Sequence, residues 1–113
     1  MYYTYMLRCE DNSIYTGIAS NLERRMEEHF ERNGKEAKYT RSRKAKCLEV
    51  AWQSENKSTA SKLEYWIKKL NKENKENLIK DPNLLRDMLK EKIEPEKYHK
   101  VEAKNKYITA NFS

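Results

Sequence analysis

The sequence predicts one small α/β domain, and three observations support this prediction. The chain has 113 residues, which is the length of a single domain. Two aromatic and apolar runs near the start are separated by the turn-forming residues Asp11-Asn12-Ser13. Stretches with helical periodicity then alternate with a third strand-like run. The expected order is strand, strand, helix, strand, helix, with shorter helices after it.

The first two strands are predicted to form a hairpin over Tyr2–Cys9 and Ser13–Ile18. Because side chains alternate along a strand, a two-residue loop would place Tyr5 and Tyr15 on opposite faces, and a three-residue loop on the same face. We predict the three-residue loop and therefore a shared face. Gly17, near the end of the second strand, indicates a bulge or the close approach of another group.

A helix follows the hairpin directly. It is predicted from Leu22 to Arg32, with Ser20 or Asn21 as its N-cap. Arg25 and His29 are four residues apart, so they form a polar line along one side of this helix.

The third strand is predicted at Leu48–Trp52, and the helix after it at Thr59–Leu70. Asn56 or Ser58 opens this helix. Glu64 lies beside its apolar stripe, so we expect its carboxylate at the edge of the core.

The rest of the chain is expected to form a helical, highly charged extension. Short helices are predicted at Lys72–Lys80 and Asn83–Lys92, the second with Asp81-Pro82 as its N-cap and first residue. The domain is placed at residues 1–80 and the extension at 81–113. Several apolar side chains near the end could pack back on the domain or form a loose tail: Tyr98, Val101, Tyr107, Ile108 and Phe112.

Composition narrows the class of partner. The net charge is +6 and the pI about 9.2, which favours polyanions, although lysines also serve solubility. Cys9 and Cys47 lie far apart without a C-x-x-C pair, so no zinc site or structural disulfide is expected. No stretch approaches the roughly 20 apolar residues of a membrane span, and the start does not read as a signal peptide. We expect a cytoplasmic protein without membrane contact.

The motifs resemble those of the GIY-YIG nuclease domain. Tyr3-Thr4-Tyr5 keeps the tyrosine of the first family triplet, and Tyr15-Thr16-Gly17 keeps tyrosine and glycine of the second. The likeness spans about residues 1–80 and is greatest to small stand-alone bacterial members, through the runs Asn21–His29 and Ala37–Arg41. It implies a three-stranded, largely antiparallel sheet flanked by helices, with a helical C-terminal extension here.

Two positions depart from the family pattern. Ile18 stands where the repair-endonuclease branch has a lysine. The asparagine that often follows the catalytic glutamate by about a dozen residues has only a distant counterpart here, Asn77.

The resemblance also implies roles for side chains. The catalytic set is Tyr5, Tyr15, Arg25, His29 and Glu64. One tyrosine would activate water and the other would position water or phosphate, with the assignment left open. Arg25 would stabilise charge on phosphorus oxygens, and His29 would assist. Glu64 would hold one Mg²⁺ or Mn²⁺ ion, since a single carboxylate suits a single hard cation.

A basic stretch with one aromatic ring follows the first helix. Its residues suit a surface that tracks phosphates and stacks a base, although a solvated basic loop would look the same. The candidate nucleic-acid-binding residues are Lys38, Tyr39, Arg41, Arg43 and Lys44.

These features together predict a divalent-metal-dependent endonuclease that hydrolyses DNA with low sequence specificity. Single-stranded or branched DNA is the expected substrate, and RNA remains open. One alternative is a binding module of the same fold that does not cut. Another is a protein-interaction module that uses the apolar tail, so a protein partner also stays open.

Overall fold

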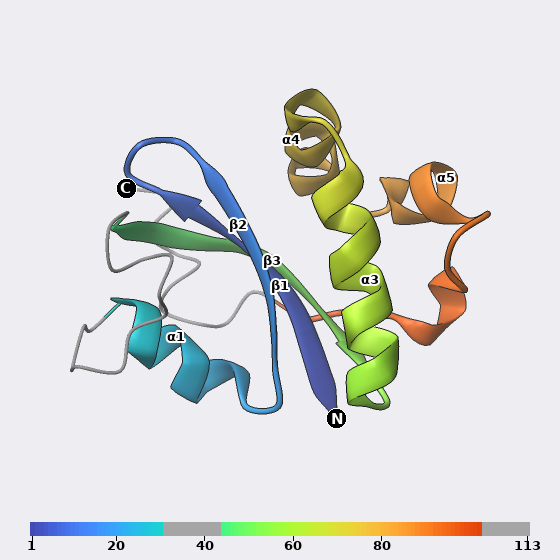
Figure 1. Ribbon diagram of the computed structural model, residues 1–113, viewed down its shortest axis with the longest axis horizontal. Helices are drawn as coiled ribbons and strands as arrows, with labels where there is room; N and C mark the ends of the chain where they lie inside the picture. Colours follow the sequence, from blue (N-terminus) through green and yellow to red (C-terminus); the bar gives the residue numbers. More distant parts are fainter. Residues whose placement is uncertain (31–43, 103–113) are drawn as a thin grey trace.

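A four-stranded antiparallel sheet forms the centre of the molecule, in the strand order β2-β1-β3-β4. The structure is a computed structural model that describes residues 1–30 and 44–102. Helix α1 lies on one side of the sheet, and helices α3, α4 and α5 lie on the other (Figure 1). The predicted fold class is therefore confirmed.

The hairpin joins β1 (Tyr2–Cys9) to β2 (Ile14–Ala19). Arg8 pairs with Ile14, and the Cys9 amide donates to the carbonyl of Ser13 (2.9 Å), which leaves a loop of three residues. Asn12 adopts a positive φ of 70° in that loop, a conformation that asparagine tolerates. The predicted loop length is confirmed, so odd-numbered residues of both strands share one face.

Strand β3 (Ala45–Ser54) pairs with β1 along its length and is longer than predicted. Its register against β1 shifts between Met6 and Leu7, so Glu49 has no opposite residue. A bulge of this kind bends the strand and redirects a side chain. Here it aims Glu49 at Arg8.

Two hydrophobic clusters occupy the two faces of the sheet. One lies between the sheet and α1 (Leu22–Phe30) and includes Tyr5, Leu7 and Met26. The other lies between the sheet and α3 (Lys57–Lys69), α4 (Lys72–Lys80) and α5 (Leu84–Leu89), and its sheet-side members are Met6, Val50 and Trp52. The alternation along β1 thus sorts neighbouring residues into different cores.

Asparagines cap three helices. The side chain of Asn21 accepts from the Arg24 amide (3.0 Å), that of Asn56 from Thr59, and that of Asn71 from Asn74. Each bond satisfies an amide that has no partner within its helix. The cap of α5 was predicted wrongly: the helix begins at Leu84, because Asp81 and Pro82 form turns that precede it.

The chain after α5 returns to the sheet and adds a strand that the sequence did not predict. A 3₁₀ turn, η1 (Pro95–Lys97), leads into β4 (His99–Lys100), which pairs with Trp52 and Gln53 of β3. Two residues are too few to show strand alternation, so three strands were expected and four are present. The domain boundary at residue 80 stays a prediction.

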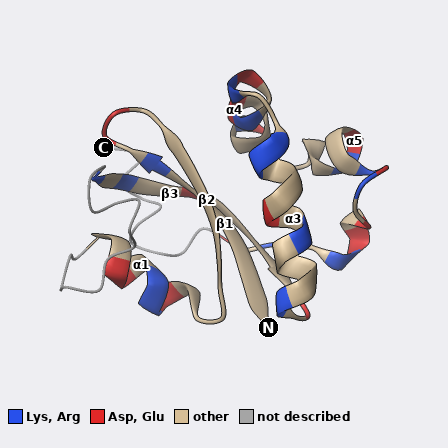
Figure 2. Cartoon of the chain, viewed as in Figure 1, with Lys and Arg blue, Asp and Glu red and all other residues tan. Residues whose placement is uncertain are grey.

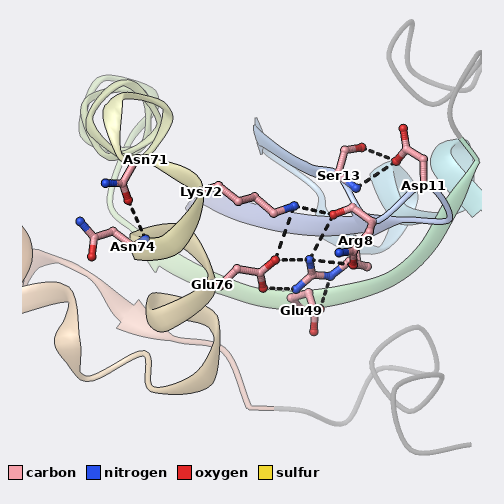
Figure 3. A network of polar contacts seen from close by, with 9 residues as sticks. Arg8, Asp11, Ser13, Glu49, Asn71, Lys72, Asn74 and Glu76 are labelled. Atoms are coloured by element: carbon pink, nitrogen blue, oxygen red, sulfur yellow. Dashed lines mark hydrogen bonds and ion pairs between the residues drawn. The ribbon is translucent and has the colours of Figure 1, made fainter.

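Arg8 ties the hairpin to two other elements (Figure 3). Its guanidinium donates to Glu49 of β3 (2.9 Å) and, through two nitrogens, to Glu76 of α4 (2.6 and 2.5 Å). Two weaker bonds reach Asn12 in the hairpin loop (3.3 Å each). The hydrogen bond from Arg8 holds the pKa of the Glu76 carboxyl below its usual value.

Acidic and basic residues alternate along the helices (Figure 2). Cys9 and Cys47 are both buried thiols in strands, as expected. No helix in residues 1–30 and 44–102 is long and apolar enough to cross a membrane. The predicted tail residues Tyr107, Ile108 and Phe112 lie outside the described residues, whereas Tyr98 and Val101 pack on the domain.

Candidate active site

Four of the five predicted catalytic residues meet on the α1 face of the sheet. Tyr5 comes from β1, Tyr15 from the neighbouring strand β2, and Arg25 and His29 from α1. Because β1 and β2 pair with a three-residue loop, both tyrosine rings rise from the same face. Their ring centroids lie 6.1 Å apart, at an interplanar angle of 50°.

Gly17 makes room for the ring of Tyr5, which lies opposite it in the register. A Cβ at position 17 would lie 2.7 Å from the hydroxyl oxygen of Tyr5, 2.8 Å from its Cζ and 3.0 Å from the ring of Tyr15. No side chain fits at these distances. The close approach predicted for Gly17 is therefore the packing of the two tyrosines on its backbone.

Tyr5 is fully buried. Its hydroxyl contacts both helix residues of the tyrosine cluster, which we define as Tyr5, Tyr15, Arg25 and His29. Its oxygen lies 2.9 Å from His29 Nε2 and accepts a long hydrogen bond from Arg25 Nε (3.4 Å). While the oxygen accepts from Arg25, the Tyr5 proton can be donated to His29 Nε2 if that nitrogen carries no proton. That arrangement requires a neutral imidazole with Nε2 as the acceptor.

The protonation of these two groups agrees with that arrangement. Burial lowers the pKa of His29 from 6.5 to about 4, and the charge of Arg25 adds to this effect, so the imidazole is neutral at pH 7. Burial also raises the pKa of Tyr5, with a further contribution from Tyr15, and the hydrogen bond from Arg25 opposes the rise only in part. Nearby positive charge therefore does not make Tyr5 a phenolate here.

Tyr15 is partly exposed, unlike Tyr5. Its ring centroid lies 5.5 Å from that of His29, and the ring of Tyr5 contacts the same imidazole at 5.7 Å. Both contacts are tilted or edge-on, as aromatic pairs prefer. Tyr15 is thus the tyrosine of the pair that solvent can reach.

Arg25 borders a hollow of about 240 Å³ at the junction of β2 and α1. Its guanidinium is held by Tyr5 on one side and by Glu28 (2.5 Å) on the other. Arg24 lines the same hollow, although it points away from the line that joins Arg25 to His29. Two guanidinium groups beside a half-open hollow can receive a phosphate group.

Glu64 is not in contact with the other four residues. It lies on α3, on the opposite face of the sheet, and its recorded partner among the described residues is Lys68 (3.1 Å). Trp66 packs against the hydrophobic cluster on this face of the sheet, and Glu64 lies about 200° around the helix from Trp66. Glu64 therefore projects from a different side of α3 than Trp66, and α3 also contacts the edge strand β2.

The donor set for a metal is small. Within residues 1–30 and 44–102, no three His, Cys, Asp or Glu side chains come together as ligands. A lone carboxylate on a partly exposed helix still fits a Mg²⁺ or Mn²⁺ ion that takes its other ligands from water and substrate. Such an ion would have to displace Lys68 from Glu64.

The structure describes one of the five predicted nucleic-acid-binding residues. Lys38, Tyr39, Arg41 and Arg43 lie outside the described residues. Lys44 is described and exposed, just before β3, where its carbonyl accepts from the Glu10 amide (2.8 Å). Sequence reasoning missed Glu28, although its spacing of three residues from Arg25 on one helix is a usable sign of an ion pair.

The catalytic domain of one nuclease superfamily is defined by the combination seen here. It consists of this strand order, two tyrosines packed over a glycine, and an arginine and a histidine one helical turn apart. Residues 1–77 match the family described as the GIY-YIG catalytic domain, and the chain belongs to that family. The resemblance stated from the motifs is thereby confirmed.

Its relatives include small bacterial and archaeal proteins named UPF0213. The chain is 49% identical to UPF0213 protein FN1575 of Fusobacterium nucleatum over 73% of this chain and 80% of that protein. It is 41% identical to CPE1444 of Clostridium perfringens over 82% of this chain and 98% of that protein. A solution NMR structure of BH0048 from Bacillus halodurans covers 71% of this chain and 84% of its own, with 37% identity and a TM-score of 0.44.

Proposed function

We propose that the protein is an endonuclease that hydrolyses phosphodiester bonds of DNA with one divalent metal ion. The observation that supports this most is the convergence of Tyr5, Tyr15, Arg25 and His29 over Gly17. Membership of the GIY-YIG family supports the nuclease class. The metal and the mechanism are part of the proposal.

Tyr15 is the better candidate for activating water. Only a group that reaches solvent can contact a nucleophilic water, and Tyr5 is fully buried while Tyr15 is partly exposed. Tyr5 then acts as a positioning residue, because its hydroxyl fixes both the imidazole of His29 and the guanidinium of Arg25. Neutral His29 can accept the proton of the Tyr5 hydroxyl, whose oxygen lies 2.9 Å from Nε2.

Arg25 is placed to stabilise the negative charge that develops on phosphorus oxygens. It is held on two sides, so little side-chain freedom remains to be lost when a phosphate binds. The hollow beside it is open to a substrate. Arg24 would contribute a second positive charge to the same phosphate backbone.

Glu64 would hold the metal, and its helix α3 contacts the edge strand β2. That strand has β1 as its neighbour on one side, so a group at its free edge can be approached from both faces of the sheet. When bound, a divalent ion would supply Lewis-acid stabilisation of phosphate oxygens. In the absence of metal, Lys68 neutralises the carboxylate.

The test is a cleavage assay on single-stranded, duplex and branched DNA, with Mg²⁺, Mn²⁺ or EDTA. We expect metal-dependent cutting that Glu64→Ala and Arg25→Ala reduce at least 100-fold, and Tyr15→Phe about as much. Matched controls change a similar side chain away from the site: Glu73→Ala, Arg86→Ala and Tyr65→Phe. All three should cut normally.

The pairing of Glu64 with Lys68, away from the tyrosines, favours one other function. A protein that binds nucleic acid through the same surface without cutting would need no free carboxylate. Binding of DNA by the wild type without cleavage in Mg²⁺ or Mn²⁺ would establish that function and contradict the nuclease. RNA substrates belong in the same assay.

A further inference from the structure

A carboxylate lines the hollow in which the substrate phosphate is placed under the proposed function. The hollow between β2 and α1 is lined by Arg24 and Arg25, and also by Glu28. Among the described residues that line it, Glu28 is the only acidic one. A negative charge beside a bound phosphate weakens the binding, so the carboxylate limits which phosphate the hollow accepts.

Glu28 is bound to Arg25 within the wall of the hollow. Its Oε1 accepts a hydrogen bond from Arg25 Nη1 (2.5 Å), three residues away on the same helix. The side chain of Glu28 is 17% exposed and that of Arg25 is 30% exposed. A charge-assisted bond that is partly shielded from water is stronger than an ion pair on an open surface. The carboxylate is therefore a fixed part of this wall.

The bond to Glu28 decides which nitrogen of Arg25 can reach a ligand. Arg25 Nε donates to the hydroxyl of Tyr5, and Nη1 donates to Glu28. The guanidinium is planar and rigid, so two such bonds fix its orientation. Within residues 1–30 and 44–102, Nη2 has no recorded partner. Glu28 is thus a positioning residue that leaves Nη2 of Arg25 for a phosphate oxygen.

The charges of the hollow match one kind of phosphate. Two guanidinium groups and one carboxylate leave a single positive charge in excess. A phosphodiester inside a strand carries one negative charge. A phosphate monoester carries nearly two at pH 7, because its second pKa is about 6. The second charge of a monoester would face the carboxylate of Glu28, whereas a diester has no such charge.

We propose that Glu28 makes this hollow select phosphodiesters over phosphate monoesters. The inference rests on the proposed function, because it takes the hollow as the position of the phosphate that is cut. Hydrolysis adds the hydroxyl of water to phosphorus and its proton to the leaving oxygen, which yields a monoester. Ionisation of the new P–OH group adds a negative charge, and Glu28 repels it. The side chain that positions Arg25 for the substrate therefore also favours release of the product.

The experiment compares two ligands that differ by one methyl group. Thymidine 5′-monophosphate is a monoester, and its methyl ester is a phosphodiester with one charge. Each is titrated into the ¹⁵N-labelled full chain in EDTA at pH 7, and the NMR signal of the Arg25 Nε–H group reports binding. We expect the wild type to bind the methyl ester at least about threefold more tightly than the monophosphate, and thymidine more weakly than either.

The matched variants are Glu28→Gln and Glu23→Gln. Glu28→Gln keeps an oxygen that accepts from Arg25 and removes the charge, so the ratio of the two Kd values should shift toward the monophosphate by at least about fivefold. Glu23 is exposed in the first turn of the same helix, and Glu23→Gln should keep the wild-type ratio. Loss of folded protein would weaken both ligands equally, so the ratio reports selectivity alone.

Three outcomes would overturn the proposal. They are tighter binding of the monophosphate than of the methyl ester by the wild type, the same ratio in the wild type and Glu28→Gln, and no change of the Arg25 signal with either ligand. Failure of the proposed function is a separate result. A wild type that does not cut DNA contradicts the nuclease, whereas the ligand preference is measured without cleavage.

Discussion

A methyl group added at Gly17 has no free space above the backbone. The Cβ of Gly17→Ala would lie 2.7 Å from the hydroxyl oxygen of Tyr5, and that oxygen is bound to His29 and Arg25. We expect the free energy of unfolding to fall by about 1–3 kcal/mol, as for other overpacked positions. Chemical denaturation measures it. Ser20→Ala, at an exposed neighbouring position, is the control, and equal stability of the two variants would contradict this packing.

His29 makes stability depend on pH. Its pKa falls from 6.5 to about 4 on folding, so between these values the unfolded chain binds a proton that the folded protein does not. Stability from this group is therefore complete above pH 6.5 and is lost as the pH falls toward 4, by up to about 3 kcal/mol. Urea denaturation from pH 7 to 4 measures the slope.

Two variants isolate the contribution of this imidazole. His29→Gln should flatten the pH dependence between 6.5 and 4, whereas His99→Gln, at an exposed histidine, should leave it as in the wild type. Parallel curves for His29→Gln and the wild type would show that His29 is not held neutral.

Lys68 competes with a metal ion for Glu64, to which it is paired at 3.1 Å. Lys68→Met should therefore tighten Mn²⁺ binding several-fold, because the carboxylate no longer has to release an ammonium group. Lys69→Met is the control, since Lys69 lies over the ring of Tyr65 instead. Mn²⁺ electron paramagnetic resonance measures free ion directly. An unchanged Mn²⁺ affinity in Lys68→Met would show that the metal does not bind at Glu64.

At the residue scale, the sequence predicted the tyrosine pair well because strand alternation and loop length decide which face a side chain takes. It also predicted the line from Arg25 to His29, because helical spacing fixes it. Burial could not be predicted. Nothing in the sequence distinguishes fully buried Tyr5 from partly exposed Tyr15, since that difference depends on how α1 covers the sheet.

At the scale of elements, Arg8 joins β1, β3, α4 and the hairpin loop. Its side chain is 12% exposed and that of Glu49 is 7% exposed, so removing the guanidinium takes the positive charge away from a nearly buried carboxylate. We expect Arg8→Ala to lower the free energy of unfolding by about 2–4 kcal/mol. Lys97→Ala, which breaks an ion pair on the surface, should change it by less than about 0.5 kcal/mol.

A paired substitution separates the cost of an unpaired charge from the loss of packing. Arg8→Met with Glu49→Leu removes both charges and keeps apolar volume, so it should recover part of the stability that Arg8→Ala loses. If the double variant is as unstable as Arg8→Ala, the bonds from Arg8 to Glu76 carry the stabilisation instead.

Element order was predictable because each long strand and helix has its own periodicity and its own cap. The same rules failed where an element is short. Strand β4 has two residues, and α5 begins after turns that Asp81-Pro82 start. The position of Glu64 also escaped prediction, because periodicity places it on a helix face but not on a face of the sheet.

At the scale of the whole molecule, the net charge of +6 is spread among charges of both signs (Figure 2). If Arg24, Arg25 and Lys44 each contact one phosphate, the affinity for single-stranded DNA should weaken about 20-fold between 50 and 200 mM salt. Fluorescence anisotropy measures this slope. Lys44→Ala should reduce the slope by about 0.7. Lys90→Ala, at an exposed lysine just after α5, should leave the salt slope unchanged. Identical slopes for Lys44→Ala and the wild type would show that DNA does not contact Lys44.

The burial of Tyr5 has a practical consequence for genetics. A side chain that belongs both to the hydrophobic interior and to the reactive cluster cannot be replaced without weakening both. The phenotype of a Tyr5 allele in cells will therefore combine a lower level of folded protein with a lower catalytic activity. Separation-of-function alleles should be made at Arg25, which is partly exposed and anchored only at its tip.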